Sequence, residues 1–146
     1  MRTINEIIIH CTATEAKFNV TLATIDQWHK ARGWKGCGYH FIIHQNGHID
    51  IGRPITEAGA HCKGHNANSI GIVYVGGMLN GKTSDTRTYE QNQSLVLLIK
   101  TLCRIFPTIT AVKGHNEYSS KACPCFNVQV FCFVNRIVPY NTEYDD

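Results

Sequence analysis

Apolar and polar positions alternate along this chain with periods that change from segment to segment. Residues 6–10 and 69–75 are almost continuously apolar and rich in β-branched side chains. Such runs are typical of strands that are buried on both faces of a sheet. A third short run, residues 109–112, has the same character. The pattern therefore predicts buried strands near the start, the middle and the last third of the chain.

Two further strands are predicted at residues 38–44 and 48–52. The dipeptide Asn46-Gly47 lies between them, and Asn-Gly is a strong short-range signal for a tight hairpin turn. Residues 53–68 lack any periodicity and contain one proline and two glycines. We expect them to form a long loop, and long loops inside compact domains usually carry function.

Helical periodicity dominates three other segments. Residues 22–33 follow a potential cap in the segment Asn19-Val20-Thr21, and residues 89–106 place apolar side chains on one face before Pro107 ends the pattern. A last helix is predicted at residues 127–138. Strands that alternate with helices indicate an α/β fold.

Two polar segments complete the chain. Residues 80–88 are expected to form a surface excursion, and residues 139–146 a polar tail. The sequence thus predicts one α/β domain, residues 1–146, with a mixed central β-sheet flanked by helices.

The composition adds limits on partners and location. The chain has 146 residues, 43% of them hydrophobic, and a formal net charge of +3. No cluster of Lys and Arg indicates nucleic acid, no apolar stretch is long enough to insert into a membrane, and nothing indicates a protein partner. Because no signal peptide is visible, we expect synthesis in the cytoplasm. The weak positive charge is compatible with a polyanionic partner such as a cell wall.

Seven cysteines make an odd number, which argues against a framework of disulfides. Free thiols in a reducing compartment are the simpler interpretation. Cys103 and Cys132 fall within apolar helical patterns and are expected to be small core residues.

The candidate chemistry lies at the two ends of the chain. His10 ends the first apolar run, His115 follows the strand at 109–112, and Cys123 lies eight residues later. Two imidazoles and one thiolate form the three-ligand set of a catalytic zinc site, which leaves a fourth position open. From the residues alone, a structural role for each histidine and a core position for the cysteine remain open.

Other histidine pairs are poorer candidates for a metal. His40 and His44 lie on one side of a strand, but four residues of strand span roughly 13 Å. His61 and His65 would need a helical loop to share an ion, and Gly64 argues against one.

A resemblance strengthens the zinc interpretation. The chain resembles the zinc-dependent N-acetylmuramoyl-L-alanine amidases of the type-2 family, which include phage amidase-type lysozymes and peptidoglycan recognition proteins. The phage enzymes are the most similar in character, and the resemblance covers about residues 7–126. The matching segments are Ile7-Ile8-Ile9-His10-Cys11-Thr12-Ala13-Thr14, Trp28-His29-Lys30, Gly38-Tyr39-His40-Phe41-Ile42-Ile43, Gly59-Ala60-His61 through Asn68-Ser69-Ile70-Gly71-Ile72, and Gly114-His115 through Lys121-Ala122-Cys123-Pro124.

The resemblance implies a function and a set of site residues. It implies hydrolysis of the amide between the lactyl group of N-acetylmuramic acid and L-alanine of the stem peptide. It makes His10, His115 and Cys123 the ligands of one zinc ion, and it gives Tyr39 and Lys121 catalytic roles as hydrogen-bond donors. The substrate would be peptidoglycan of the bacterial wall after release, or muropeptides in the cytosol.

Some features remain open. His61 is expected either to contact substrate or to be structural, and Asn116 and Glu117 to hydrogen-bond the His115 ring. Cys125 departs from the family pattern, because a second thiol there would compete for zinc or form a disulfide with Cys123.

Two other functions stay open as well. One is a cysteine hydrolase in which Cys123 is the nucleophile. The other is a module that binds muropeptides without cutting them.

Overall fold

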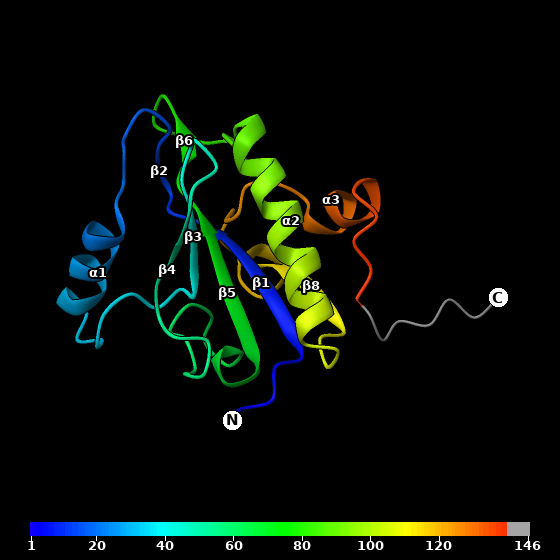
Figure 1. Ribbon diagram of the computed structural model, residues 1–146. Helices are drawn as coiled ribbons and strands as arrows, with labels where there is room; N and C mark the ends of the chain where they lie inside the picture. Colours follow the sequence, from blue (N-terminus) through cyan, green and yellow to red (C-terminus); the bar gives the residue numbers. More distant parts are fainter. Residues whose placement is uncertain (140–146) are drawn as a thin grey trace.

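A five-stranded sheet forms the centre of the computed structural model, which describes residues 1–139 (Figure 1). The strand order is β4-β3-β5-β1-β8; β1, β3, β5 and β8 run parallel, and β4 pairs antiparallel with β3 at one edge. The predicted mixed sheet is thus confirmed. The strands are β1 (Glu6–Cys11), β3 (Phe41–Ile43), β4 (Ile49–Ile51), β5 (Ser69–Tyr74) and β8 (Ala111–Gly114).

Helices cover both faces of this sheet (Figure 1). They are α1 (Leu22–Ala31), α2 (Tyr89–Ile105) and α3 (Val128–Val134). Because side chains alternate along a strand, Ile7 and Ile9 of β1 share a core with α2 and α3. Ile42 of β3 and Val73 of β5 point the other way and pack with Ile25 of α1. Each central strand is therefore buried on both faces, as its apolar run predicts.

The ends of the helices follow local capping chemistry. Thr21 accepts a hydrogen bond from the Thr24 N–H at the start of α1. Thr88 and Gln91 form a reciprocal capping box at the start of α2. All three predicted helices are present in the structure.

A small three-stranded sheet, which sequence reasoning missed, uses part of the segment 80–88 that was expected to be a surface excursion. β6 (Gly77–Leu79) and β7 (Lys82–Thr83) form a hairpin, and β2 (Thr14–Glu15) pairs with β6. The turn residues Asn80 and Gly81 both have positive φ, 52° and 78°. Asn80-Gly81 is the same turn signal as Asn46-Gly47, whose predicted hairpin is confirmed as β3–β4.

Several predicted boundaries were wrong by a few residues. β8 begins at Ala111, two residues later than expected, and β3 is shorter than the predicted strand 38–44. α3 ends at Val134 and not near 138, because Arg136 adopts a left-handed conformation with φ 54° and ends the helix. Of the predicted tail 139–146, residues 140–146 lie outside the described part of the chain.

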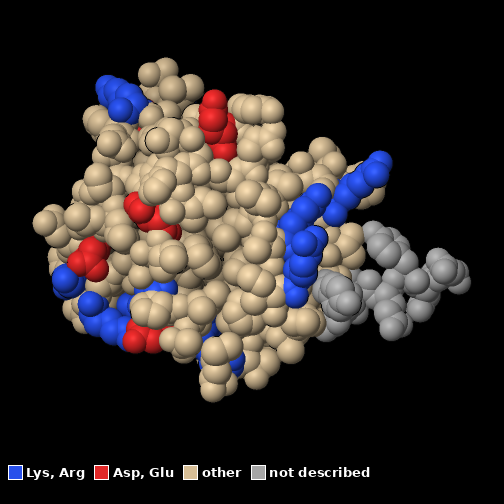
Figure 2. Space-filling model, viewed as in Figure 1, with Lys and Arg blue, Asp and Glu red and all other residues tan. Residues whose placement is uncertain are grey.

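The structure shows how the charged residues and the cysteines are distributed. Charges of both signs are scattered over the face shown in Figure 2. Among residues 1–139, no helix is long and apolar enough to cross a membrane. All seven cysteines are unpaired, and Cys103 and Cys132 are buried in the core as expected.

We expect Ile72→Ala in β5 to lower the free energy of unfolding by about 2–5 kcal/mol, because Ile72 is fully buried between β1, β3 and the helices. Ile51→Ala in edge strand β4 is the matched control, since Ile51 is 68% exposed. Urea unfolding of both variants measures the difference. Equal losses would contradict the proposed location of the core.

Candidate active site

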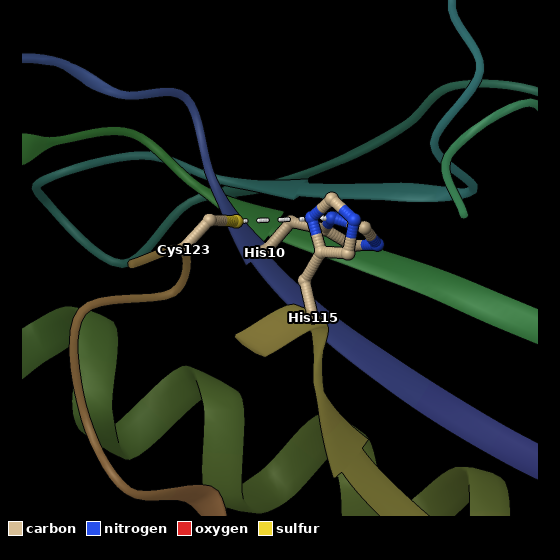
Figure 3. A group of neighbouring side chains, drawn as sticks. All are labelled: His10, His115 and Cys123. Carbon is tan, nitrogen blue, oxygen red and sulfur yellow. Dashed lines mark hydrogen bonds between the residues drawn. The ribbon is translucent and has the colours of Figure 1, made fainter. Parts of the chain in front are cut away.

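Three candidate ligands meet at one end of the sheet (Figure 3). His10 lies near the end of β1, His115 begins the short 3-10 helix η2 (His115–Glu117), and Cys123 belongs to the segment that follows. One ligand atom from each residue lies within 4.8 Å of the others. The Cys123 Sγ is 3.9 Å from the His10 Nδ1. The structure thus brings together the three residues that the sequence singled out.

The sheet explains why the two imidazoles are neighbours. His10 is one residue out of phase with Ile9, so its side chain leaves the face that packs against α2. β8 runs parallel to β1 with Ile9 opposite Gly114, which places His115 beside His10. The centres of the two rings are 4.6 Å apart. His10 is only 1% exposed, so the site begins inside the protein.

Two hydrogen bonds hold the segment around Cys123 against the central sheet. The Tyr74 hydroxyl donates to the Pro124 carbonyl at 2.7 Å, and this contact is buried. The Cys11 N–H donates to the Cys123 Sγ at 3.2 Å. The segment after His115 therefore folds back, as the spacing of eight residues required.

The electrostatics shift the two imidazoles toward their neutral forms and the Cys123 thiol toward its ionised form. Burial holds the pKa of His10 well below its usual value, with further contributions from His61, His115 and Lys121. Burial and Lys121 also lower the pKa of His115. The pKa of Cys123 is lowered, although burial acts to raise it. The largest cause is the hydrogen bond with the Cys11 thiol, and the Cys11 N–H and Lys121 contribute less. These protonation states are the ones that metal ligands need.

The donor set fits zinc. In tetrahedral coordination a sulfur and a nitrogen ligand are roughly 3.5 Å apart, close to the 3.9 Å between Cys123 Sγ and His10 Nδ1. One soft thiolate and two imidazoles are ligands that zinc accepts. Within the described chain, no other group of three or more such side chains is close enough to hold a metal ion.

A groove of about 730 Å³ opens above these residues. Tyr39 and Lys121 both line it, together with Arg32, Trp34 and Lys63. Tyr39 is half-buried, its ring centre lies 5.2 Å from that of His10, and burial raises the pKa of its hydroxyl. Lys121 is exposed and forms no ion pair with any described residue. Both predicted donors therefore face the same space as the candidate ligands.

His61 also lines the groove, but its ring nitrogens are occupied by the protein. Its Nδ1 is 2.8 Å from the Nε2 of His10, and its Nε2 is 3.1 Å from the Oγ of Ser69. The sequence left a substrate contact and a structural role open for His61. Because both ring nitrogens already have partners in the protein, these contacts favour the structural role.

Asn116 and Glu117 are directed away from the His115 ring. Glu117 accepts hydrogen bonds from the Gly114 N–H and from Gln129, and Asn116 donates to the Phe126 carbonyl. In the part of the chain that the structure describes, neither hydrogen-bonds the imidazole of His115. The two side chains brace the turn that carries His115.

Cys125 points away from the candidate ligands. Its Sγ lies 3.9 Å from the Sγ of Cys11 and 3.4 Å from the Gly77 carbonyl oxygen. Burial raises the pKa of Cys125 to about 11. It forms no disulfide with Cys123 and is not part of the three-residue group.

Sequence reasoning missed a contact that joins the two loops around the groove. Glu6, at the start of β1, accepts a hydrogen bond from the Tyr118 hydroxyl at 2.6 Å, and its other oxygen is 3.2 Å from the His65 Nδ1. The rings of His65 and Tyr118 stack with centres 3.8 Å apart. The only sign of this contact in the sequence is a glutamate, Glu6, at the start of an apolar run.

The comparisons with known proteins agree with this geometry. A family model described as N-acetylmuramoyl-L-alanine amidase matches residues 1–126. The chain belongs to the N-acetylmuramoyl-L-alanine amidase family and is an enzyme of this class. The family resemblance stated from the motifs is thereby confirmed.

Relatives include phage lysis enzymes. The chain is 41% identical over 133 residues to the endolysin of Escherichia phage T7, with 90% of this chain and 87% of the endolysin covered. Its fold is similar to the solved N-acetylmuramoyl-L-alanine amidase LysC from Clostridium intestinale, with a TM-score of 0.80, 32% identity, and coverage of 93% and 87%. Drosophila PGRP-LB shares the fold at a TM-score of 0.74 and 24% identity, with coverage of 100% and 87%.

We expect Tyr118→Phe to lower the free energy of unfolding by about 1–3 kcal/mol, because it removes a hydrogen bond to the buried Glu6 carboxylate and keeps the ring. Tyr89→Phe is the control, since Tyr89 is 75% exposed at the start of α2. Chemical denaturation compares the two. A stability equal to that of the control would mean that the Tyr118–Glu6 contact contributes nothing.

Proposed function

We propose that this chain is a zinc-dependent amidase that cleaves peptidoglycan between the muramic lactyl group and L-alanine of the stem peptide. The observation that carries the proposal is the meeting of His10, His115 and Cys123 at the base of a groove. Tyr39 and Lys121 line that same groove. Family membership and the phage endolysin relatives support the same reaction.

His10, His115 and Cys123 would hold the ion. When bound, zinc supplies Lewis-acid polarisation of a carbonyl and makes water more acidic. The chain presents two neutral imidazoles and a thiolate, so the loaded centre keeps a formal charge of +1. This charge is lower than in a site with three imidazoles, which leaves more of the stabilisation to neighbouring donors.

Lys121 and Tyr39 are those donors. The Lys121 ammonium, which is free of ion pairs among residues 1–139, stabilises negative charge that develops on the scissile carbonyl oxygen. Burial keeps the Tyr39 hydroxyl protonated at neutral pH, so it donates a hydrogen bond inside the groove. Either group is placed to supply a proton to the leaving amine.

The charge of the groove fits an anionic substrate. Its charged lining residues are Arg32, Lys63 and Lys121, and none of the carboxylates within residues 1–139 lines the groove. Stem peptides carry several carboxylates, so they are attracted to this lining. The half-buried Trp34 adds an aromatic surface to the lining of the same groove.

We expect a strong chelator to abolish hydrolysis and added zinc to restore it, because His10, His115 and Cys123 lie close enough together to hold one ion. Mass spectrometry of digested peptidoglycan should show stem peptides that begin with L-alanine, alongside peptide-free glycan. Activity that resists the chelator but is lost on thiol alkylation would support the cysteine hydrolase instead. Binding of muropeptides with no product from zinc-loaded protein would support the binding module.

We expect Lys121→Ala and Tyr39→Phe each to lower kcat by on the order of 10²–10³, because each removes one donor from the groove. Zinc content, measured by mass spectrometry of the metal, should stay at one ion per chain in both variants. Lys100→Ala in α2 and Tyr89→Phe are the matched controls outside the groove. Turnover near that of the controls would exclude the role assigned to that residue.

A further inference from the structure

The imidazole of His61 occupies a slot prepared by the backbone. A Cβ at Gly59 or at Gly71 would lie only 2.6 Å from the His61 Cδ2. Neither glycine has a positive φ in the left-handed range, so the constraint at both positions is space. At Gly71 that space is taken by the His61 ring, and at Gly59 by the ring together with the Gly38 carbonyl oxygen and the His40 ring. The slot lies on the face of β5 that also carries Ser69, two residues before Gly71. The location of the ring is therefore set before any ligand binds.

The ring connects His10 to a buried hydroxyl. His10 Nε2, His61 Nδ1, His61 Nε2 and Ser69 Oγ form a chain with contacts of 2.8 Å and 3.1 Å. His10 is 1% exposed and Ser69 is fully buried, so solvent does not replace these partners. Each contact needs one donor and one acceptor.

Only one arrangement of protons leaves the His10 Nδ1 free to bind a metal. That atom faces Cys123 Sγ, so its lone pair must be unprotonated and the ring proton must lie on Nε2. The Nε2–H then donates to His61 Nδ1. His61 carries its own proton on Nε2 and donates it to the Ser69 Oγ, which accepts because a hydroxyl has free lone pairs.

We propose that His61 is a positioning residue that keeps the proton of His10 on Nε2 and aims the His10 Nδ1 lone pair at the zinc ion. This inference rests on the zinc site of the proposed function. It assigns His61 an effect on metal affinity, whereas a substrate contact would affect KM. Partners of this kind on ligating histidines typically contribute 10–100-fold to metal affinity.

Zinc affinity of the full chain, measured by competition with a chromophoric chelator, tests the proposal. His61→Phe keeps a ring in the slot and removes the acceptor, so zinc affinity should fall about 10–100-fold. His61→Gln should recover part of the loss, because its amide oxygen can accept from His10 Nε2. His48→Phe on the β3–β4 hairpin is the control, since the His48 side chain is 64% exposed.

A second variant alters the contact between His61 and Ser69, at the other end of the chain of contacts that begins at His10. Ser69→Ala removes the acceptor for His61 Nε2 and leaves the zinc ligands and the slot intact. It should weaken zinc binding in the same direction as His61→Phe, but less. This variant keeps the test valid if the phenylalanine variant fails to fold.

The outcomes separate the two proposals. Unchanged zinc affinity in both His61→Phe and Ser69→Ala, with a raised KM, would overturn the positioning role and return His61 to substrate contact. Wild-type protein that binds no zinc would overturn the proposed function, and this inference with it. Wild-type protein that binds zinc but cuts no peptidoglycan would refute only the proposed reaction, and the affinity comparison would still decide the role of His61.

Discussion

Alternation of side chains along β1 is the constraint on which the rest of this structure depends. Ile7 and Ile9 enter the core against α2 and α3, while His10 leaves on the opposite face. Because β1 lies between β5 and β8, this one strand organises the sheet and also carries the first candidate ligand. A shift of one residue in its register would place the histidine in the apolar core and an isoleucine in the groove.

The parallel neighbours of β1 supply the remaining parts of the site. β8 ends next to His10 and delivers His115, and β5 offers Ser69 and Gly71 beside the His61 ring. His10 thus lies on a strand and His115 directly follows one, whereas Cys123 and Lys121 come from a segment held by contacts such as that of Tyr74 with Pro124. This division puts the two imidazoles on a rigid frame and leaves the groove walls to loops.

Buried polar groups around the groove are partnered throughout. In residues 1–139, no buried side-chain nitrogen or oxygen lacks a hydrogen-bond partner. Glu6 illustrates the arrangement, because its carboxylate joins the loop of His65 to the loop of Tyr118. Buried polar networks rarely stabilise a fold more than apolar packing would. We therefore infer that the Glu6 network serves to fix the relative positions of the loops that carry His65 and Tyr118.

Periodicity and local turn chemistry by themselves determined the mixed α/β architecture, the three helices and the β3–β4 hairpin. Residue chemistry singled out His10, His115 and Cys123 as a possible ligand set, and the family resemblance strengthened that choice. These features depend on neighbours in the chain or on residue types whose chemistry is restrictive. The pairing of β2 with β6 and the surroundings of Cys125 depend on which distant strands and thiols meet, so only the tertiary structure decided them. The same holds for His61: its contacts with His10 and Ser69 join residues 51 and 8 positions apart, and the slot exists because Gly59 and Gly71 both approach the His61 ring.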